Sequence, residues 1–255
     1  MNLPFAPPLD PMLSNRLRMN VTKGVLIVGL GGLGVPAAIA AVRGGVRILG
    51  LVDPDPVELS NLPRQVIYRE ADLGRLKVDA AAERLSRSTP GLEVERMPFA
   101  LEPRNAQRIL GEFGFIVDAT DNPAIKFLIN DLCVAAGIPF VYGGVLGMAG
   151  QAMSVLPGRT ACLRCLFEGP PEESEMASCR DAGIIGPVAG AIGMIQGDEA
   201  ARWNRGEPLE LAGKMMVYEG ARGGRPRVIE AGVRERCGCG AARAAARIEA
   251  GYRAG

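Results

Sequence analysis

A cluster of glycines follows the first apolar run of the chain, and it has the residue types needed to bind a phosphate group. Residues 25–28 are apolar and rich in β-branched side chains, and the next turn contains Gly29, Gly31, Gly32 and Gly34. Glycines let a backbone approach a phosphate closely, and the helix expected after them offers unpaired N–H groups. The turn therefore predicts a nucleotide site, although its G-x-G-x-x-G spacing fits NAD, FAD and ATP alike.

The residues after the second apolar run favour ATP. Asp53 ends that run, where its carboxylate could accept hydrogen bonds from ribose hydroxyls. A dehydrogenase would normally enter a helix soon after this acid, whereas this chain presents Asn61, Arg64 and Gln65, and then Lys77. Arginine grips phosphate oxygens with two donors and lysine acts as a point charge, so two cations here suit a triphosphate.

The sequence DATDN follows the strand expected at residues 115–117 and supplies another acid. Asp121 and Asn122 would lie at the carboxyl end of that strand, which is the ligand-binding side of an open α/β sheet. A carboxylate there can hold a magnesium ion that bridges the phosphates. Asp121 is therefore the candidate magnesium ligand, with Asn122 beside the nucleotide.

Two cysteine pairs have the spacing of metal ligands. Cys162 and Cys165 form a CxxC pair, and Cys237 and Cys239 form a CxC pair. Four thiolates would make a closed, structural zinc site that joins the C-terminal segment to the loop after the sheet. The CxC spacing is less usual, and reduced surface thiols are the alternative interpretation.

Composition excludes several classes of protein. The chain has 255 residues, is 48% hydrophobic and carries a net charge of +1, so no broad basic field argues for nucleic acid. We expect no membrane segment and no signal peptide, hence a cytoplasmic protein in which disulfides are not expected. The absence of histidine removes the commonest general base.

Strands alternate with helices up to residue 144, which predicts a Rossmann-like, doubly wound α/β sheet that is mostly parallel. Antiparallel strands and a zinc-stapled C-terminal segment should extend it. The elements expected in this second part are a strand at 151–156, a loop at 157–165, an apolar helix at 184–203 and a hairpin at 214–229. The expected organisation is an N-terminal arm at 1–22, one ATP-binding domain at 23–240 with a mobile crossover loop at 165–182, and a tail at 241–255.

Taken together, the motifs resemble the ThiF/MoeB/HesA family, the bacterial relatives of ubiquitin-activating enzymes. The resemblance rests on VLIVGLGGLG, LVDPDPVELSNLPRQ, LGRLKV, DATDN, the CxxC pair and SCRDAGIIGPVAG, in that order over roughly residues 20–240. It implies a homodimeric adenylyltransferase that uses Mg-ATP to activate the C-terminal glycine of a small ubiquitin-like sulfur-carrier protein and releases pyrophosphate. It also implies that Asp53 binds the ribose, that Asp121 is the magnesium-linked acid, and that the nucleotide is contacted by Asn61, Arg64, Gln65 and Lys77.

The resemblance adds two further candidates. Cys179 stands where relatives carry a cysteine that attacks the activated carrier or forms a sulfur link with it. Arg16, or alternatively Arg18, is the nearest match to an arginine that reaches the partner subunit's ATP, although the link to the first strand is shorter here. Family members usually have CxxC in both cysteine pairs, so the CxC pair is a departure.

The sequence leaves the pathway open. Thiamine, molybdopterin and other sulfur-transfer systems share these motifs, and the sulfur is expected from a separate donor protein. Two alternatives to the adenylyltransferase are a non-catalytic partner subunit of the same family and a dinucleotide-dependent oxidoreductase.

Overall fold

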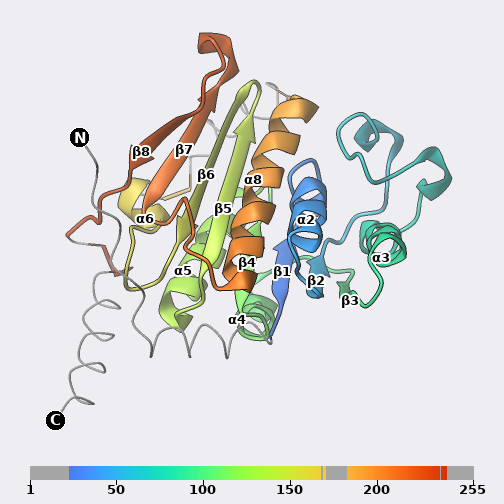
Figure 1. The fold of residues 1–255 in the computed structure, drawn as a ribbon, viewed down its shortest axis with the longest axis horizontal. Helices are drawn as coiled ribbons and strands as arrows, with labels where there is room; N and C mark the ends of the chain where they lie inside the picture. The colour runs from blue at the N-terminus through green and yellow to red at the C-terminus, as the bar shows by residue number, and fades with distance from the viewer. Residues whose placement is uncertain (1–22, 168, 171–182, 236, 240–255) are drawn as a thin grey trace.

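The fold is built on one eight-stranded sheet (Figure 1). The computed structural model describes residues 23–167, 169–170, 183–235 and 237–239. The strand order is β3-β2-β1-β4-β5-β6-β7-β8. The strands are β1 (Val25–Val28), β2 (Ile48–Val52), β3 (Glu93–Met97), β4 (Phe115–Asp118), β5 (Phe140–Leu146), β6 (Ala149–Val155), β7 (Lys214–Glu219) and β8 (Arg227–Glu230).

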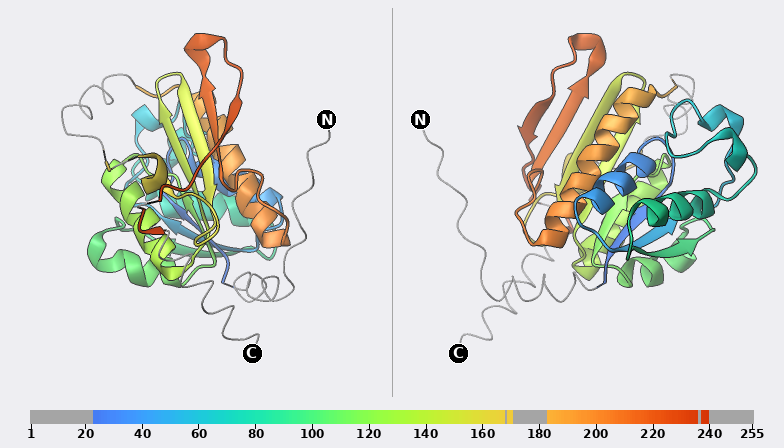
Figure 2. Two further views of the ribbon diagram at one scale, coloured as in Figure 1. Left: turned by 90° about the vertical axis from the view of Figure 1, so that its left-hand side faces the viewer. Right: turned by 45° about the vertical axis from the view of Figure 1, so that its right-hand side comes forward.

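Helices cover both faces of the parallel part of the sheet (Figure 2). They are α2 (Gly34–Arg43), α3 (Lys77–Ser88), α4 (Pro103–Gly111), α5 (Pro123–Ala136), the single turn α6 (Leu163–Leu166) and α8 (Gly186–Arg205). Alternate residues of β1 point to opposite faces, as the period of a strand requires. Val25 and Ile27 pack with α2, α3 and α8, whereas Leu26 and Val28 pack with α4 and α5.

The first five strands of this order, β3 to β5, pair in parallel, and β5 to β8 pair antiparallel. The predicted doubly wound sheet with an antiparallel extension is therefore confirmed. The order reverses between β1 and β4, which are neighbours although β2 and β3 intervene in sequence. Ligands of open α/β sheets bind at such a reversal, outside the carboxyl ends of the strands.

One detail of the prediction was wrong. The loop expected at residues 157–165 contains the start of α6, which begins at Leu163. The backbone N–H of Leu163 donates to the buried side chain of Asn130 on α5 at 2.9 Å, and this contact supports the turn. A hydrogen bond between residues 33 apart in sequence cannot be predicted from the residues next to Leu163.

Helices α2 and α8 approach each other closely because α8 has glycines where it crosses α2. A Cβ built at Gly193 would lie 3.0 Å from the carbonyl carbon of Leu33, and one at Gly197 would lie 3.0 Å from that of Ala37. Real Cβ atoms rarely come so near to backbone, so these positions require glycine. Since Leu33 belongs to the glycine turn, α8 packs directly behind the predicted phosphate site.

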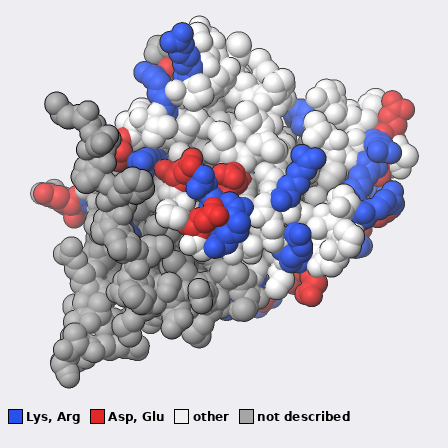
Figure 3. Space-filling model, viewed as in Figure 1, with Lys and Arg blue, Asp and Glu red and all other residues white. Residues whose placement is uncertain are grey.

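The distribution of charged side chains on the surface agrees with the net charge of +1. On the face drawn in Figure 3, basic and acidic side chains lie beside one another, with uncharged surface between them. Within the described part of the chain, none of the helices combines the length and apolar character needed to cross a bilayer.

Candidate nucleotide site and cysteine cluster

The glycine turn is held from beneath by two buried side chains. The backbone N–H of Leu30 donates to the Asp53 carboxylate at 2.6 Å, and the Tyr68 hydroxyl donates to the Leu30 carbonyl at 3.1 Å. Gly29 has a φ of +90°, and a Cβ there would lie 2.8 Å from the Ala119 carbonyl oxygen. The turn is thus fixed between β2, β4 and the segment around residue 68, and its conformation requires glycine.

Asp53 and Lys77 form a buried charged group at the carboxyl end of β2. The Lys77 ammonium lies 3.7 Å from Asp53 and 2.8 Å from Asp55, whose side chain is 60% exposed. Burial raises the pKa of the Asp53 carboxyl, and the positive charge of Lys77 opposes that rise. The pair places a cation next to the glycine turn.

Asn61, Arg64 and Gln65 lie on one compact turn beside the glycines. The backbone N–H groups of Arg64 and Gln65 both donate to the Asn61 carbonyl, at 3.1 and 3.0 Å. The side chain of Gln65 lies 3.8 Å from where a Cβ of Gly31 would be, and its buried Oε1 has no hydrogen-bond partner among the described residues. A buried acceptor without a partner is costly, which suits a site that a ligand donor completes.

Arg64 connects this turn to α8. A Cβ at Gly32 would lie 3.9 Å from the Arg64 Cγ, and one at Gly186 would lie 3.3 Å from the Arg64 Cβ. The guanidinium donates to the Ser60 carbonyl at 2.8 Å. The backbone and first side-chain carbons of Arg64 therefore lie between the glycine turn and the first residue of α8, and the guanidinium binds the turn at Ser60.

Asp121 and Asn122 form the turn between β4 and α5. Asp121 is exposed and follows Thr120, whose backbone nitrogen would lie 3.3 Å from a Cβ of Gly29 in the glycine turn. Asn122 is the N-cap of α5, and its side-chain oxygen accepts from the N–H groups of Ala124 and Ile125 at 2.9 and 3.4 Å. Asn122 thus has a structural role in addition to the one predicted for it.

The structure gathers most of the predicted nucleotide residues at the reversal of strand order. These are the four glycines together with Asp53, Asn61, Arg64, Gln65, Lys77 and Asp121. Arg16, Arg18, Cys179 and residues 171–182 of the predicted crossover loop lie outside the described residues, as do the arm at 1–22 and the tail at 241–255.

The predicted cysteine pairs meet in one cluster. The sulfurs of Cys162, Cys165, Cys237 and Cys239 all lie within 4.8 Å of one another, with pairwise distances of 3.9, 3.6 and 3.3 Å for three of the pairs. Tetrahedral zinc with bonds of about 2.3 Å requires sulfurs about 3.8 Å apart, so this set fits the ion. Burial raises the pKa of the Cys162 thiol to about 11, and a bound cation would favour the thiolate forms.

Helix α5 positions the first cysteine pair. The buried Asn130 accepts from the Leu163 N–H, and Asp131 forms two bonds with the Arg164 guanidinium at 2.6 and 2.7 Å. The guanidinium also lies 5.1 Å from the centre of the Phe127 ring. Sequence reasoning missed these supports, because their residue types are common on helices.

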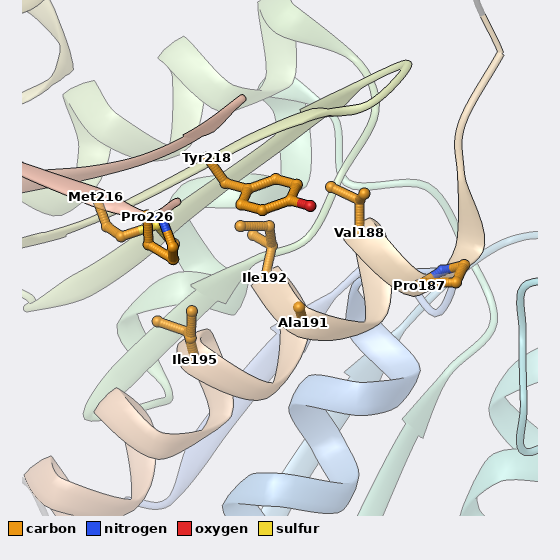
Figure 4. Close-up of a pocket in the computed structure, with 8 residues that line it drawn as sticks. All are labelled: Pro187, Val188, Ala191, Ile192, Ile195, Met216, Tyr218 and Pro226. Carbon is orange, nitrogen blue, oxygen red and sulfur yellow. The ribbon is translucent and has the colours of Figure 1, made fainter. Parts of the chain in front are cut away.

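An apolar groove lies between α8 and the antiparallel extension (Figure 4). Its volume is about 200 Å³. Val188, Ile192 and Ile195 of α8 line one side, and Met216 and Tyr218 of β7 line the other. The groove begins at the N-terminal end of α8, the end that adjoins the candidate nucleotide site.

Residues 15–239 match the model of the ThiF family. The chain belongs to the ThiF family. Its relatives include the adenylyltransferase and sulfurtransferase MOCS3-2 of Zea mays, which is 39% identical over 81% of this chain and 42% of the relative. Another is the adenylyltransferase and sulfurtransferase uba4 of Aspergillus terreus, which is 44% identical over 70% of this chain and 38% of the relative.

This ThiF-family chain spans less than half the length of those two curated relatives. Solved structures agree on the fold. The crystal structure of E. coli MccB with ATP has a TM-score of 0.76 at 20% identity and covers 91% of this chain and 70% of MccB. The resemblance read from the motifs is thus confirmed, and the relatives are named adenylyltransferases.

Proposed function

We propose that this ThiF-family chain is an adenylyltransferase that uses Mg-ATP to activate the C-terminal glycine of a small ubiquitin-like sulfur-carrier protein. The observation that carries the proposal is the convergence of the glycine turn, Arg64, Lys77 and Asp121 at the reversal of strand order. Two cations and an exposed acid beside a phosphate-binding turn suit a triphosphate substrate. The names of the curated relatives support the same activity.

In this proposal the nucleotide lies across the glycine turn. Each oxygen of Asp53 accepts one backbone N–H, from Leu30 or Asp55, and a carboxylate oxygen can accept a second bond from a ribose hydroxyl. The free Oε1 of Gln65 can accept a further donor of the nucleotide. Lys77 would exchange its contact with the exposed Asp55 for a phosphate oxygen.

The proposed reaction needs positioning and charge neutralisation more than proton transfer. A glycine carboxylate oxygen attacks the α-phosphorus, the new O–P bond forms, and the bond to the β-phosphate breaks to release pyrophosphate. The carboxylate is already ionised at neutral pH, so a chain without histidine is compatible with this chemistry. Arg64 and Lys77 would neutralise charge on the phosphates.

Two metals accompany the proposal. A magnesium ion would neutralise phosphate charge, and the exposed carboxylate of Asp121 is the side chain proposed to hold it. Zinc would bind the four-cysteine cluster as a structural ion, because the sulfurs are already gathered at suitable distances.

Several partners complete the proposal. The carrier's apolar surface would occupy the groove of α8 and β7, which leads towards Arg64. We further propose a homodimer in which Arg16 or Arg18 reaches the partner's nucleotide, a chemical role for Cys179 towards the activated carrier, and a separate sulfur-donor protein. A reaction that consumes ATP supports a cytoplasmic location.

ATP–pyrophosphate exchange with carrier proteins that end in Gly-Gly tests this function. We expect carrier-dependent exchange in the presence of magnesium and its loss in Asp121→Ala. Asp198→Asn, which alters an exposed acid on α8, serves as the matched control and should exchange normally. A protein that binds Mg-ATP but exchanges with no carrier would instead be a non-catalytic partner subunit, and binding of NADH in place of ATP would favour the oxidoreductase.

The three residues proposed for roles outside the described part of the chain have their own tests. Loss of exchange in Arg16→Ala or Arg18→Ala, rescued by mixing with an Asp121→Ala subunit, would support action in trans. Unchanged exchange in both arginine variants would rule that role out. A thiol-labile adduct between protein and carrier that disappears in Cys179→Ser would support the chemical role of the cysteine.

A further inference from the structure

A buried ion pair lies behind the β4–α5 turn, where the sequence motifs had assigned nothing. Lys126 of α5 places its ammonium 3.3 Å from both carboxylate oxygens of Asp118, the last residue of β4. The same ammonium donates to the Gly143 carbonyl of β5 at 2.6 Å and lies 5.0 Å from the centre of the Tyr142 ring. Lysine is rarely buried without such pairing, so the partners of the ammonium compensate for the burial of its charge.

The Asp118 carboxylate in turn shapes the backbone that leads to Asp121. Its Oδ1 accepts from the Thr120 N–H at 3.1 Å and from the Thr120 hydroxyl at 2.8 Å. From the other side, the buried Gln196 of α8 donates to the Asp118 carbonyl at 2.7 Å. Asp118 therefore connects β4, α8 and the turn whose next residue is Asp121.

We propose that Lys126 is a positioning residue for adenylation: by neutralising Asp118 and holding the end of β4 to β5, it fixes the turn that presents Asp121. This inference rests on the proposed function. Lys126 itself is buried behind the turn and acts through Asp118 and Thr120. Without the ammonium, a fully buried carboxylate would be left without its cation, and water or a shift of the turn would have to compensate.

Lys126→Met tests the role, because methionine replaces the apolar stem of lysine as far as Cε but removes the ammonium with its charge and its three donors. We expect the turnover of pyrophosphate exchange to fall by about 100-fold, as misplacement of a reacting group by about 1 Å does. The KM for ATP should stay within about threefold, since the glycine turn, Asp53 and Lys77 are untouched. The magnesium concentration for half-maximal exchange should rise.

Three variants separate positioning from simple stability. Lys126→Arg keeps the cation and should recover most of the exchange. Asp118→Asn/Lys126→Met removes both buried charges, so it should fold stably even if the single variant does not, and its exchange should stay low because the bond to the Gly143 carbonyl is still missing. Lys23→Met alters an exposed lysine that binds the Gly111 carbonyl at the opposite end of β1, and it should behave as wild type.

Deuterium uptake by the backbone of residues 118–124 supplies a measurement that does not depend on activity. Faster uptake there in both Lys126→Met variants, with unchanged uptake in Lys23→Met, is the expected result. Full recovery of exchange in the double variant, or wild-type uptake and turnover in Lys126→Met, would overturn the inference. Absence of exchange in the wild-type protein would refute the proposed function instead. Deuterium uptake over residues 118–124 would still test whether Lys126 holds the turn in place.

Discussion

The close packing of α8 behind the glycine turn can be tested with two glycines of the same helix. Gly193→Ala places a Cβ 3.0 Å from the Leu33 carbonyl carbon and closer still to its oxygen, whereas a Cβ at Gly190 meets no described atom within 4 Å. Both substitutions remove a glycine from a helix interior, which should contribute about 1 kcal/mol of stability in each case. The difference in stability between the two variants therefore measures the cost of the new contact with Leu33.

The expected loss of stability in Gly193→Ala follows from the distance between its new Cβ and the Leu33 carbonyl. Carbon atoms pack best at about 3.5–4.0 Å, so the new Cβ must displace backbone rather than a flexible side chain. Overpacking of this kind costs about 1–3 kcal/mol, and for a chain of this size 1 kcal/mol shifts Tm by about 2–4 °C. We expect Gly190→Ala to raise Tm and Gly193→Ala to melt about 2–12 °C below Gly190→Ala.

Thermal melts and ATP titration calorimetry of the two variants complete the test. Because the displaced residue belongs to the phosphate-binding turn, Gly193→Ala should also weaken ATP binding, and Gly190→Ala should leave it unchanged. Equal melting temperatures would show that α2 and α8 adjust without cost. A destabilised Gly193→Ala variant with wild-type ATP affinity would refute the link between this contact and the turn.

Three further predictions concern the charged group and the cysteine cluster. Burial raises the pKa of Asp53 and Lys77 opposes it, so Lys77→Met should raise that pKa further and move the acid limit of ATP binding to higher pH, as measured by calorimetry across pH. Asn130→Ala leaves the buried Leu163 N–H unpaired and should cost about 1–3 kcal/mol in urea denaturation, where an unchanged midpoint would contradict the role. Cys239→Ser should lower the zinc content measured by atomic absorption, while Cys133→Val, which alters a buried cysteine outside the cluster, should not.

Local patterns predicted most of the fold because the elements depend on nearby residues. The strand at Val25–Val28 is an uninterrupted apolar run, and Gly137 marks the end of α5. The glycine turn and Asp53 were found for the same reason, since both sit at the ends of such runs. Their contact across the sheet then followed from the parallel topology.

The supports of the site could not be predicted, because they come from side chains that meet only in the folded chain. Lys126 and Asn130 have the types and spacing of ordinary helix residues, and nothing local distinguishes them from exposed ones. Tyr68 supports the glycine turn from 38 residues away in sequence. Which residues act as supports depends on which polar groups the fold buries and leaves in need of a partner. A single sequence does not show which groups these are.

The cysteine cluster also has a consequence for the entropy of the chain. It joins sulfurs that are 74 and 75 residues apart, and the segment between them carries α8, β7 and β8. A metal held there would close this segment into a ring and reduce the freedom of the unfolded chain, as a disulfide across a loop of this length does by about 4 kcal/mol. The ring includes the helix that packs behind the glycine turn, so chelation would lower the free energy of unfolding of the fold that carries the phosphate site without touching any residue of that site.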